Sequence, residues 1–359
     1  MTAPTHTHMM YPESPMHRRY LVAFLFSLLT TQLHSQELEL VGTIPGPATT
    51  VTVHENRAYV SEGPTLRLFN IEEPTRPSLL GSFTFPQNIY GVSVSGTIVY
   101  AAGDFYGLGI IDVSNPAAPE QIGYFQTPGQ ALSVAHAGST VVVTNRLSGL
   151  ELIDVSNPSA PVSQGSYFTE GYAIDVDAAG AFAYVIDTPG GLSVIDLSQS
   201  GDLEPTGIQG VREPSAAISV TNFRSPDGRD ITLAGLMSAN SGLELFDVSN
   251  PSTPISVGTY RDPGRPQTTF IGAAATVGYV HVQMHESRAF LADVYPPFAL
   301  QMIDVSDPAA PSLVTSFVPP STPRDIAVSG QLVLLAIGPT PGATTNTPSP
   351  GVLILRLKS

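Results

Sequence analysis

Short aliphatic runs recur along the chain, each bounded by Gly, Pro, Asn or Asp. Two neighbouring examples are Ala173–Gly180 (AIDVDAAG) and Ala183–Ile186 (AYVI). Runs of this length between turn-forming residues are typical of β-strands joined in antiparallel meanders. Other runs carry adjacent aliphatic residues, as at Ile110–Ile111 and Leu152–Ile153, which indicates strands covered on both faces. The pattern predicts an all-β protein whose sheets stack against one another.

One sequence unit is repeated in tandem along the chain. Gly107–Pro119 (GLGIIDVSNPAAP) and Gly149–Pro161 (GLELIDVSNPSAP) align without gaps, and so does Gly242–Pro254 (GLELFDVSNPSTP). The remaining copies match this repeat less closely. The residue at the Asp position of the successive units is Asn70, Asp112, Asp154, Asp196, Asp247, Asp304 and Arg356. Repeats of this period are the sequence signature of architectures built from stacked supersecondary units.

Each unit contains four predicted strands, which is the composition of one β-propeller blade. The last unit stops after its third strand, at Val352–Leu357. Near the other end, Leu40–Gly46 (LVGTIPG) resembles a fourth strand such as Leu79–Phe85 (LLGSFTF). We therefore predict a seven-bladed propeller of four-stranded antiparallel blades over residues 36–359. An N-terminal strand completes the last blade and closes the ring, which hides two sheet edges.

The repeated LxIIDVSNPxxP core is similar to that of the LVIVD-repeat proteins, which are exported bacterial and archaeal β-propellers. The resemblance covers most of residues 36–359 and is strongest in units two, three, five and six. It implies a propeller and a location outside the cytoplasm. The family has no single assigned activity, so the resemblance implies no catalytic residue.

The N-terminal region has the pattern of a secretory signal peptide. His17, Arg18 and Arg19 precede the apolar stretch Tyr20–Leu33, which is short for a membrane span. We predict a signal peptide over residues 1–35, with Met16 as an alternative start, and a secreted, extracellular or periplasmic protein without a membrane span after its removal. An uncleaved signal-anchor helix is the alternative.

Composition excludes several classes of protein. The chain has no Cys, so it forms no disulfide and no Cys-ligated metal site. Its formal net charge of −15 opposes binding to nucleic acid, whose phosphates are also negative. The 33 Pro and 32 Gly suit many short strands and tight turns. We expect a monomer that binds no nucleic acid.

The repeated Asp residues invite two interpretations. Five of the seven units carry one, followed in most by Ser-Asn-Pro or Ser-Asp-Pro. An Asp in this context accepts backbone N–H bonds in the turn that ends the strand. A metal or catalytic role is the alternative, but blades repeat and a catalytic site does not. We interpret these residues as scaffold.

The first strands supply the residues closest to the predicted axis. When the first strands of the seven units are aligned, one position is aliphatic in every unit and should pack between blades. The residues directly before it form a second column, and because neighbouring strand residues point to opposite faces, they should face the channel. Most residues of this second column are small or neutral, and the exceptions are Asp175, His281 and Asp325. They are candidate catalytic residues, and Asp175 and Asp325 are candidate ligands of a divalent cation such as Ca²⁺. A polar channel lining solvated by water is the alternative.

Loops on the predicted top face supply candidate ligand-binding residues, because binding residues concentrate on loops held by a rigid scaffold. This face carries the loops that enter first strands and those that follow second strands. Its candidates could hold a polar ligand, a carbohydrate or a cation, or could form an ordinary solvated rim. They are Tyr90, Asp104, Tyr172, Asp187, Arg212, Arg265, Asp293 and Arg324.

Three functions remain open. The sequence favours an exported binding scaffold that holds a protein, peptide or glycan on the top face near the axis. A hydrolase or lyase using the axial Asp and His residues, with Ca²⁺ as an optional cofactor, is the second. A structural repeat module of the cell envelope is the third. No G-x-S-x-G, Walker or HExxH motif is present, and no cofactor other than Ca²⁺ is indicated.

Overall fold

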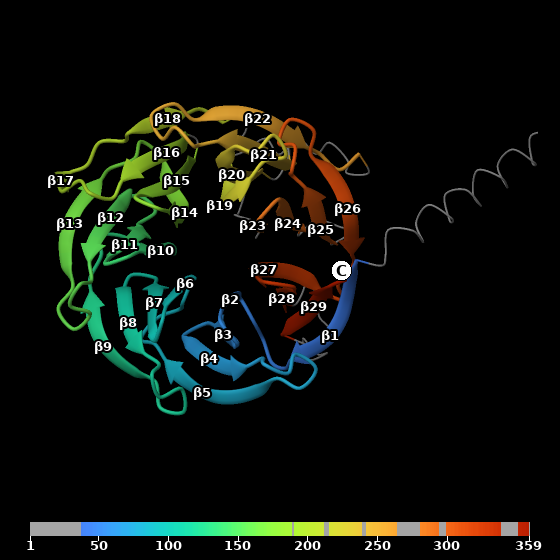
Figure 1. Ribbon diagram of the computed structural model, residues 1–359. Helices are drawn as coiled ribbons and strands as arrows, with labels where there is room; N and C mark the ends of the chain where they lie inside the picture. The colour runs from blue at the N-terminus through green and yellow to red at the C-terminus, as the bar shows by residue number, and fades with distance from the viewer. Residues whose placement is uncertain are drawn as a thin grey trace, which may run out of the picture.

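Seven β-sheets surround a central axis, as Figure 1 shows. The computed structural model describes residues 37–188, 190–211, 215–238, 242–263, 281–293, 299–338 and 351–358. The predicted signal peptide, residues 1–35, lies outside them. The sequence prediction of an all-β, seven-bladed propeller is confirmed. Within the described residues, no helix has both the length and the apolar character needed to cross a membrane.

Every blade has its first strand nearest the axis and its fourth at the rim. The strands are, for blade 1, β2 (Thr50–His54), β3 (Arg57–Glu62), β4 (Thr65–Asn70) and β5 (Ser78–Thr84); for blade 2, β6 (Gly91–Ser95), β7 (Ile98–Gly103), β8 (Gly107–Asp112) and β9 (Glu120–Phe125); for blade 3, β10 (Ser133–Ala137), β11 (Thr140–Thr144), β12 (Leu150–Asp154) and β13 (Val162–Tyr167); for blade 4, β14 (Tyr172–Ala179), β15 (Phe182–Thr188), β16 (Gly191–Asp196) and β18 (Gly207–Gln209); for blade 5, β19 (Ser215–Arg224), β20 (Asp230–Ser238), β21 (Gly242–Asp247) and β22 (Ile255–Tyr260); for blade 6, β23 (His281–His285), β24 (Arg288–Asp293), β25 (Ala299–Asp304) and β26 (Ser312–Phe317); and for blade 7, β27 (Thr322–Ser329), β28 (Leu332–Gly338), β29 (Val352–Leu357) and β1 (Leu38–Ile44).

Blade 7 is completed by the N-terminal strand, as predicted. β1 pairs antiparallel with β29, with Leu38 opposite Leu357 and Ile44 opposite Val352. The Lys358 N–H also donates to the Glu37 carbonyl at 2.9 Å. β1 lies near the start of the chain and β29 near its end, so no hairpin connects them. The ring is closed by the backbone hydrogen bonds of this ladder.

The hydrophobic core lies between neighbouring blades. In blade 3, Val141 and Val143 face blade 2, whereas Val142 faces blade 4. Both faces of the second and third strands are therefore covered, which explains the adjacent aliphatic residues in the sequence. Stacking buries these side chains almost completely.

The repeated Asp ends the third strand and caps the following turn. Asp112 accepts a hydrogen bond from the Ser114 N–H at 2.7 Å, and Asp154 accepts one from the Ser156 N–H at 2.8 Å. The same bond recurs at Asp196, Asp247 and Asp304. The structure thus shows the turn-capping interaction that the scaffold interpretation predicted.

These turns also contact the neighbouring blade through glycine. The fourth strand of one blade places a Gly against the turn of the next. A Cβ on Gly123 of blade 2 would lie 1.9 Å from the Pro158 carbonyl oxygen of blade 3. The same approach to a Pro carbonyl occurs at Gly42, Gly81, Gly207 and Gly258. Glycine here permits backbone-to-backbone packing, a feature that the sequence analysis missed.

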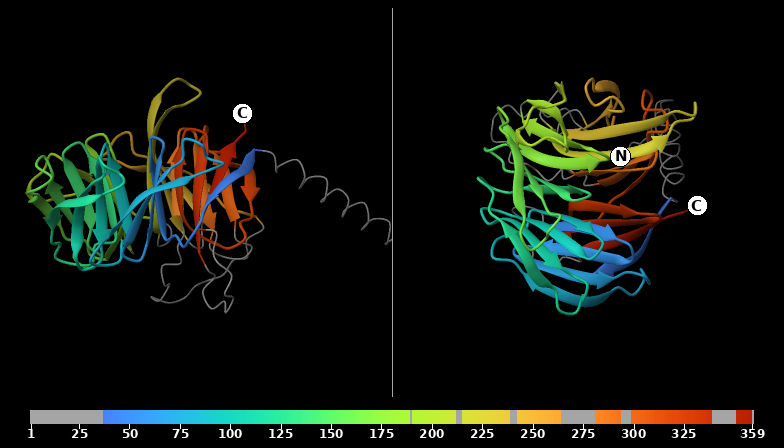
Figure 2. Two further views of the ribbon diagram at one scale, coloured as in Figure 1. Left: turned by 90° about the horizontal axis from the view of Figure 1, so that it is seen from below. Right: turned by 60° about the vertical axis from the view of Figure 1, so that its left-hand side comes forward.

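Two departures from a uniform blade concern blades 4 and 5. Between β16 and β18, the short strand β17 (Gly201–Asp202) adds in parallel to the rim of blade 3, with Gly201 opposite Gly165. In blade 5, β19 and β20 form a long hairpin that projects beyond its face of the disc (Figure 2). This hairpin is the Asn222–Asp230 insertion on the bottom face, which carries the hairpins of first and second strands.

Candidate functional site

The axial candidates lie on the innermost strands and bridge neighbouring blades. Asp325 of β27 accepts hydrogen bonds from the Val51 N–H of blade 1 and from its own neighbour, the Ile326 N–H, both at 2.8 Å. His281 of blade 6 lies beside it, with Nδ1 3.2 Å from Asp325 Oδ1. This carboxylate therefore joins blades 6, 7 and 1 at the point of ring closure.

Asp175 of β14 bonds to the two blades that flank its own. Its carboxylate accepts hydrogen bonds from the Ser133 hydroxyl of blade 3 at 2.6 Å and from the Ile218 N–H of blade 5 at 2.9 Å. The structure thus pairs His281 with Asp325, while Asp175 bonds to different blades. Burial raises the pKa of Asp325, and the adjacent His281 opposes that rise.

The carboxylates of Asp325 and Asp175 both accept hydrogen bonds from backbone N–H groups of neighbouring blades. These contacts indicate that the two side chains link blades together. Within the described ranges, no group of three or more His, Asp or Glu residues is placed to hold a metal ion. Catalysis by these residues and Ca²⁺ binding stay predictions.

A further inner-strand carboxylate, Asp177, was missed in the sequence. It accepts hydrogen bonds from the Val220 N–H of blade 5 at 2.7 Å and from the Ala178 N–H at 2.8 Å. Burial raises its pKa to about 6, and the nearby charge of Asp175 adds to the rise. Its position two residues after Asp175, on the same face of β14, was the available signal.

The raised pKa predicts a pH-dependent contribution to stability. Between the ordinary value of 3.8 and about 6, the folded protein binds a proton at Asp177 that the unfolded chain does not. The contribution is therefore full below the ordinary value and is lost as pH rises through about 6. We expect wild type to gain up to about 3 kcal/mol over Asp177→Asn when pH falls from about 7.5 to about 4.

Thermal unfolding of both proteins across this pH range checks the expectation. Other titrating groups, including His136, whose pKa burial lowers, are present in both proteins and cancel in the difference. Parallel stability curves would show that Asp177 does not titrate in this range.

The top face carries a set of exposed apolar side chains on blades 2 to 4. We call Phe105, Leu147, Phe168 and Tyr172 the top patch. Phe105 and Leu147 follow the second strands of blades 2 and 3, Phe168 lies between β13 and β14, and Tyr172 is the first residue of β14. Their exposed fractions are 69%, 64%, 73% and 46%. Exposed apolar surface of several large side chains on one face marks candidate interaction sites.

The loops that present Phe105 and Leu147 share one conformation. The preceding residues, Asp104 and Arg146, have positive φ angles of 51° and 46°. Such angles are uncommon for residues other than glycine, and they concentrate at functional sites. Each also forms an isolated β-bridge to the next blade, Asp104 with Ala131 and Arg146 with Ala173. The loop tips are consequently held against neighbouring blades with their apolar side chains outward.

Polar side chains connect the patch across three blades. The Gln130 amide nitrogen donates to Asp104 Oδ1, and Arg146 Nη1 donates to Gln130 Oε1, each at 2.9 Å. The Arg146 guanidinium carbon lies 5.7 Å from the centre of the Tyr172 ring, within cation–π range. The arrangement fixes an arginine and an aromatic ring side by side at the surface.

Two buried polar side chains lie at the second-strand ends of blades 3 and 4. Asn145 is fully buried, and neither its side-chain oxygen nor its nitrogen has a partner. Asp187 accepts a hydrogen bond from the Gly171 N–H at 3.2 Å, while its Oδ1 has no partner. Burial raises the pKa of Asp187. Unpartnered buried groups are rare in folded proteins, and these two lie beneath the loops of the top patch.

The other ligand-binding candidates are not joined to this patch by a described contact. Tyr90 donates its N–H to the Ala102 carbonyl and is partly buried, and Asp293 and Arg324 lie on blades 6 and 7. Arg212 and Arg265 lie outside the described residues. Of the predicted set, the structure brings together Asp104, Tyr172 and Asp187. It adds the residues that the sequence analysis missed, which are Phe105, Gln130, Arg146, Leu147 and Phe168.

The repeats match a known family. The model described as LVIVD repeat matches residues 89–127, 128–169, 170–203, 238–262 and 297–318. The chain belongs to the LVIVD-repeat family. Phe105, Leu147 and Phe168 lie inside matched repeats of this LVIVD-repeat propeller. A search of the curated proteins found no match.

Three solved structures of low sequence identity are similar to this LVIVD-repeat protein. The RRP9 WD40 repeats give a TM-score of 0.67 at 10% identity, covering 90% of this chain and 98% of that one. The Myceliophteria thermophila Cps50 (Swd1) β-propeller domain gives 0.66 at 13% identity, covering 89% and 100%. The computationally designed Ika8 protein gives 0.59 at 9% identity, covering 90% and 100%. Similarity at these identities concerns the fold alone.

Proposed function

We propose that this LVIVD-repeat protein is an exported interaction scaffold that binds a protein or peptide through the top patch. The propeller of LVIVD repeats supports a scaffold role in general. The top patch carries the specific proposal, because its four exposed apolar side chains all belong to the top-face ends of blades 2 to 4. The basic flank and apolar stretch Tyr20–Leu33 support export.

The composition of the patch favours a polypeptide partner. Aromatic residues and arginine dominate the binding energy of protein interfaces, and the patch combines Phe105, Phe168 and Tyr172 with Arg146. Apolar side chains of a partner would cover the two Phe rings. The Arg146 guanidinium, placed over Tyr172, would meet a carbonyl or carboxylate oxygen of the same partner.

Rigidity of the loops supports tight binding. The β-bridges at Asp104 and Arg146 hold the loop tips before a partner arrives. Association loses less free energy when the contacting side chains are already ordered. The patch therefore meets the requirement for a preformed interface.

Site-specific photo-crosslinking in the native host tests the proposal. A photoreactive residue at position 105 or 168 should give a discrete crosslinked species in the exported fraction. The same residue at Leu79 or Ile255 should not, although these rim positions are similarly exposed at 59% and 60%. Arg146→Ala should lower the yield at position 168 by about tenfold, or ~1.4 kcal/mol.

Two outcomes would overturn the proposal. Equal crosslinking at the rim and at the top patch would show that exposure alone produces the products. Absence of any crosslinked species from positions 105 and 168 in the exported protein would remove the interface.

A further inference from the structure

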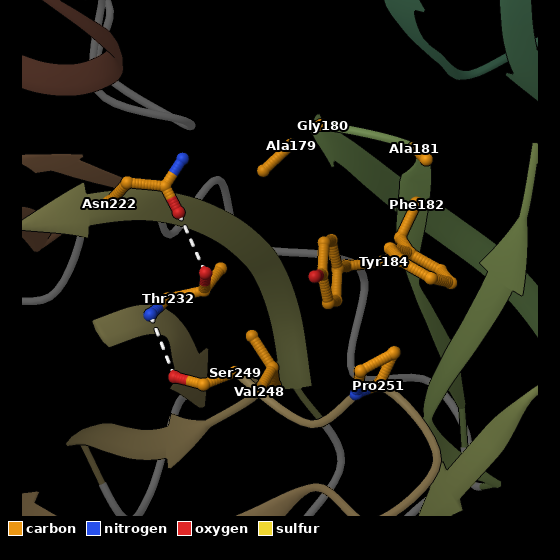
Figure 3. Close-up of a pocket in the computed structure, with 10 residues that line it drawn as sticks. All are labelled: Ala179, Gly180, Ala181, Phe182, Tyr184, Asn222, Thr232, Val248, Ser249 and Pro251. Carbon is orange, nitrogen blue, oxygen red and sulfur yellow. Dashed lines mark hydrogen bonds between the residues drawn. The ribbon is translucent and has the colours of Figure 1, made fainter. Parts of the chain in front are cut away.

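A pocket lies between blades 4 and 5 on the bottom face, beside the projecting hairpin of β19 and β20 (Figure 3). Its volume is about 210 Å³. One wall comes from the tip of the β14–β15 hairpin, and the opposite wall comes from blade 5. The lining residues are Ala179, Gly180, Ala181, Phe182, Tyr184, Asn222, Thr232, Val248, Ser249 and Pro251.

The floor of the pocket presents the Tyr184 hydroxyl. Tyr184 is only 2% exposed, and Figure 3 shows its oxygen directed into the pocket. No hydrogen bond joins this hydroxyl to another described residue. Buried tyrosine hydroxyls usually have a hydrogen-bonding partner. The fully buried Tyr59 hydroxyl at the equivalent position of blade 1 also has no partner among the described residues, so what distinguishes Tyr184 is that its hydroxyl faces a pocket that a ligand can enter.

Electrostatics keep this hydroxyl protonated. Burial, with a further contribution from the charge of Asp177, raises the pKa of Tyr184 to about 12. Tyr184 and Asp177 are paired residues on the adjacent strands β14 and β15. The phenol consequently offers a proton to an acceptor oxygen across the physiological pH range.

The mouth of the pocket offers further donors. Asn222 Oδ1 accepts a hydrogen bond from the Thr232 hydroxyl at 2.7 Å, and Figure 3 shows the Asn222 amide nitrogen directed away from Thr232. Ser249 Oγ accepts the Thr232 N–H at 2.9 Å, so its own proton is available for another acceptor. Three donors thus surround the pocket, from Tyr184, Asn222 and Ser249.

The remaining lining is apolar and uncharged. Phe182, Val248 and Pro251 supply the walls, and no lining residue carries a charge. A charged ligand would be buried there without a counter-ion, which is costly, and the Asp177 carboxylate nearby disfavours an anion further. The pocket suits a small neutral ligand that combines several acceptor oxygens with an apolar face.

We propose that this pocket binds one neutral sugar residue of a carbohydrate. A pyranose ring has hydroxyl oxygens along its edge and C–H groups on its faces, which match the three donors and the apolar walls. The volume of about 210 Å³ accommodates about one such ring. This site lies on the face opposite the top patch and does not depend on the proposed protein partner.

Ligand-observed saturation-transfer NMR tests the proposal on the intact protein. The probes are glucose, galactose, mannose and N-acetylglucosamine at millimolar concentration. At least one should show saturable binding, and Tyr184→Phe should weaken it by about tenfold or more. Asn222→Ala, at an exposed position, should weaken it as well.

A matched control separates binding from folding. Tyr59 of blade 1 and Phe290 of blade 6 occupy the blade position of Tyr184, since they pair with Thr52 and Gln283 as Tyr184 pairs with Asp177. Phenylalanine therefore fits this position, and Tyr184→Phe should fold normally. Tyr59→Phe should bind the sugar like wild type.

Three results would overturn the proposal. The first is absence of binding by all four sugars to the wild-type protein. The second is equal binding by wild type and Tyr184→Phe. The third is an equal loss of binding in Tyr59→Phe, because that variant lies far from the pocket in the ring.

Discussion

Gly123→Ala should destabilise the propeller by about 3 kcal/mol or more. The new methyl carbon would lie 1.9 Å from the Pro158 carbonyl oxygen, which belongs to the backbone of the next blade. Neither the strand nor the turn has a flexible end that could move away, so blades 2 and 3 must separate. Equilibrium unfolding in urea measures the loss.

Gly210→Ala is the matched control, because nothing lies within 4 Å of a Cβ at that position. It should leave the free energy of unfolding nearly unchanged. If Gly123→Ala and Gly210→Ala were equally stable, the close contact between blades would not exist in solution.

One blade shows why glycine is needed. The position of Gly123 in its strand, opposite Ile110, is occupied in blade 6 by Thr315, opposite Met302. The blade that follows is blade 7, whose fourth strand is β1. No turn links β29 to β1, so no Pro carbonyl approaches blade 6 at this point. Blade 6 therefore has Thr315 at this position, because no turn of blade 7 packs against it.

The fold could be predicted from sequence because its determinants are local and repeated. Strand length, turn residues and the Asp-Val-Ser-Asn-Pro segments recur along the chain, and the fourth-strand character of Leu40–Gly46 indicated ring closure. The glycine contacts were visible as a recurring Gly in the fourth strands. Their meaning depends on the backbone of another blade, which the pattern within one unit does not contain.

The axial residues were partly predictable. Strand alternation placed Asp175, His281 and Asp325 on the inner strands, where the structure has them. It could not show that Asp325 accepts the Val51 N–H across the ring closure or that Asp175 bonds to blades 3 and 5. Those contacts depend on the distance and rotation between neighbouring blades.

The top patch was missed for a different reason. Polar residues at strand ends were selected as candidates, whereas the patch consists mainly of apolar loop tips such as Phe105 and Leu147. An apolar residue in a single sequence does not reveal whether it is exposed. Here the left-handed conformations of Asp104 and Arg146 turn the tips outward, and aligning GDFYG with NRLSG was the one signal available.

Ring closure by β1 completes blade 7, whose Asp325 accepts the Val51 N–H of blade 1. Glu39 and Arg356 are opposite each other in the β1–β29 ladder, and both are exposed. The chain has no Cys, so Glu39→Cys/Arg356→Cys introduces a single possible disulfide. Such a bond would link the two ends of the propeller and stabilise it by about 2–4 kcal/mol.

The decisive measurement is the state of these two cysteines under mild oxidation, read by mass spectrometry and by non-reducing electrophoresis. Closure predicts one intramolecular disulfide and a thermal midpoint that falls when the bond is reduced. The pair Glu39→Cys/Glu120→Cys, with its second cysteine on the rim of blade 2, should stay reduced. Free thiols in the first protein, or equal disulfide formation in both, would contradict a ring closed by β1.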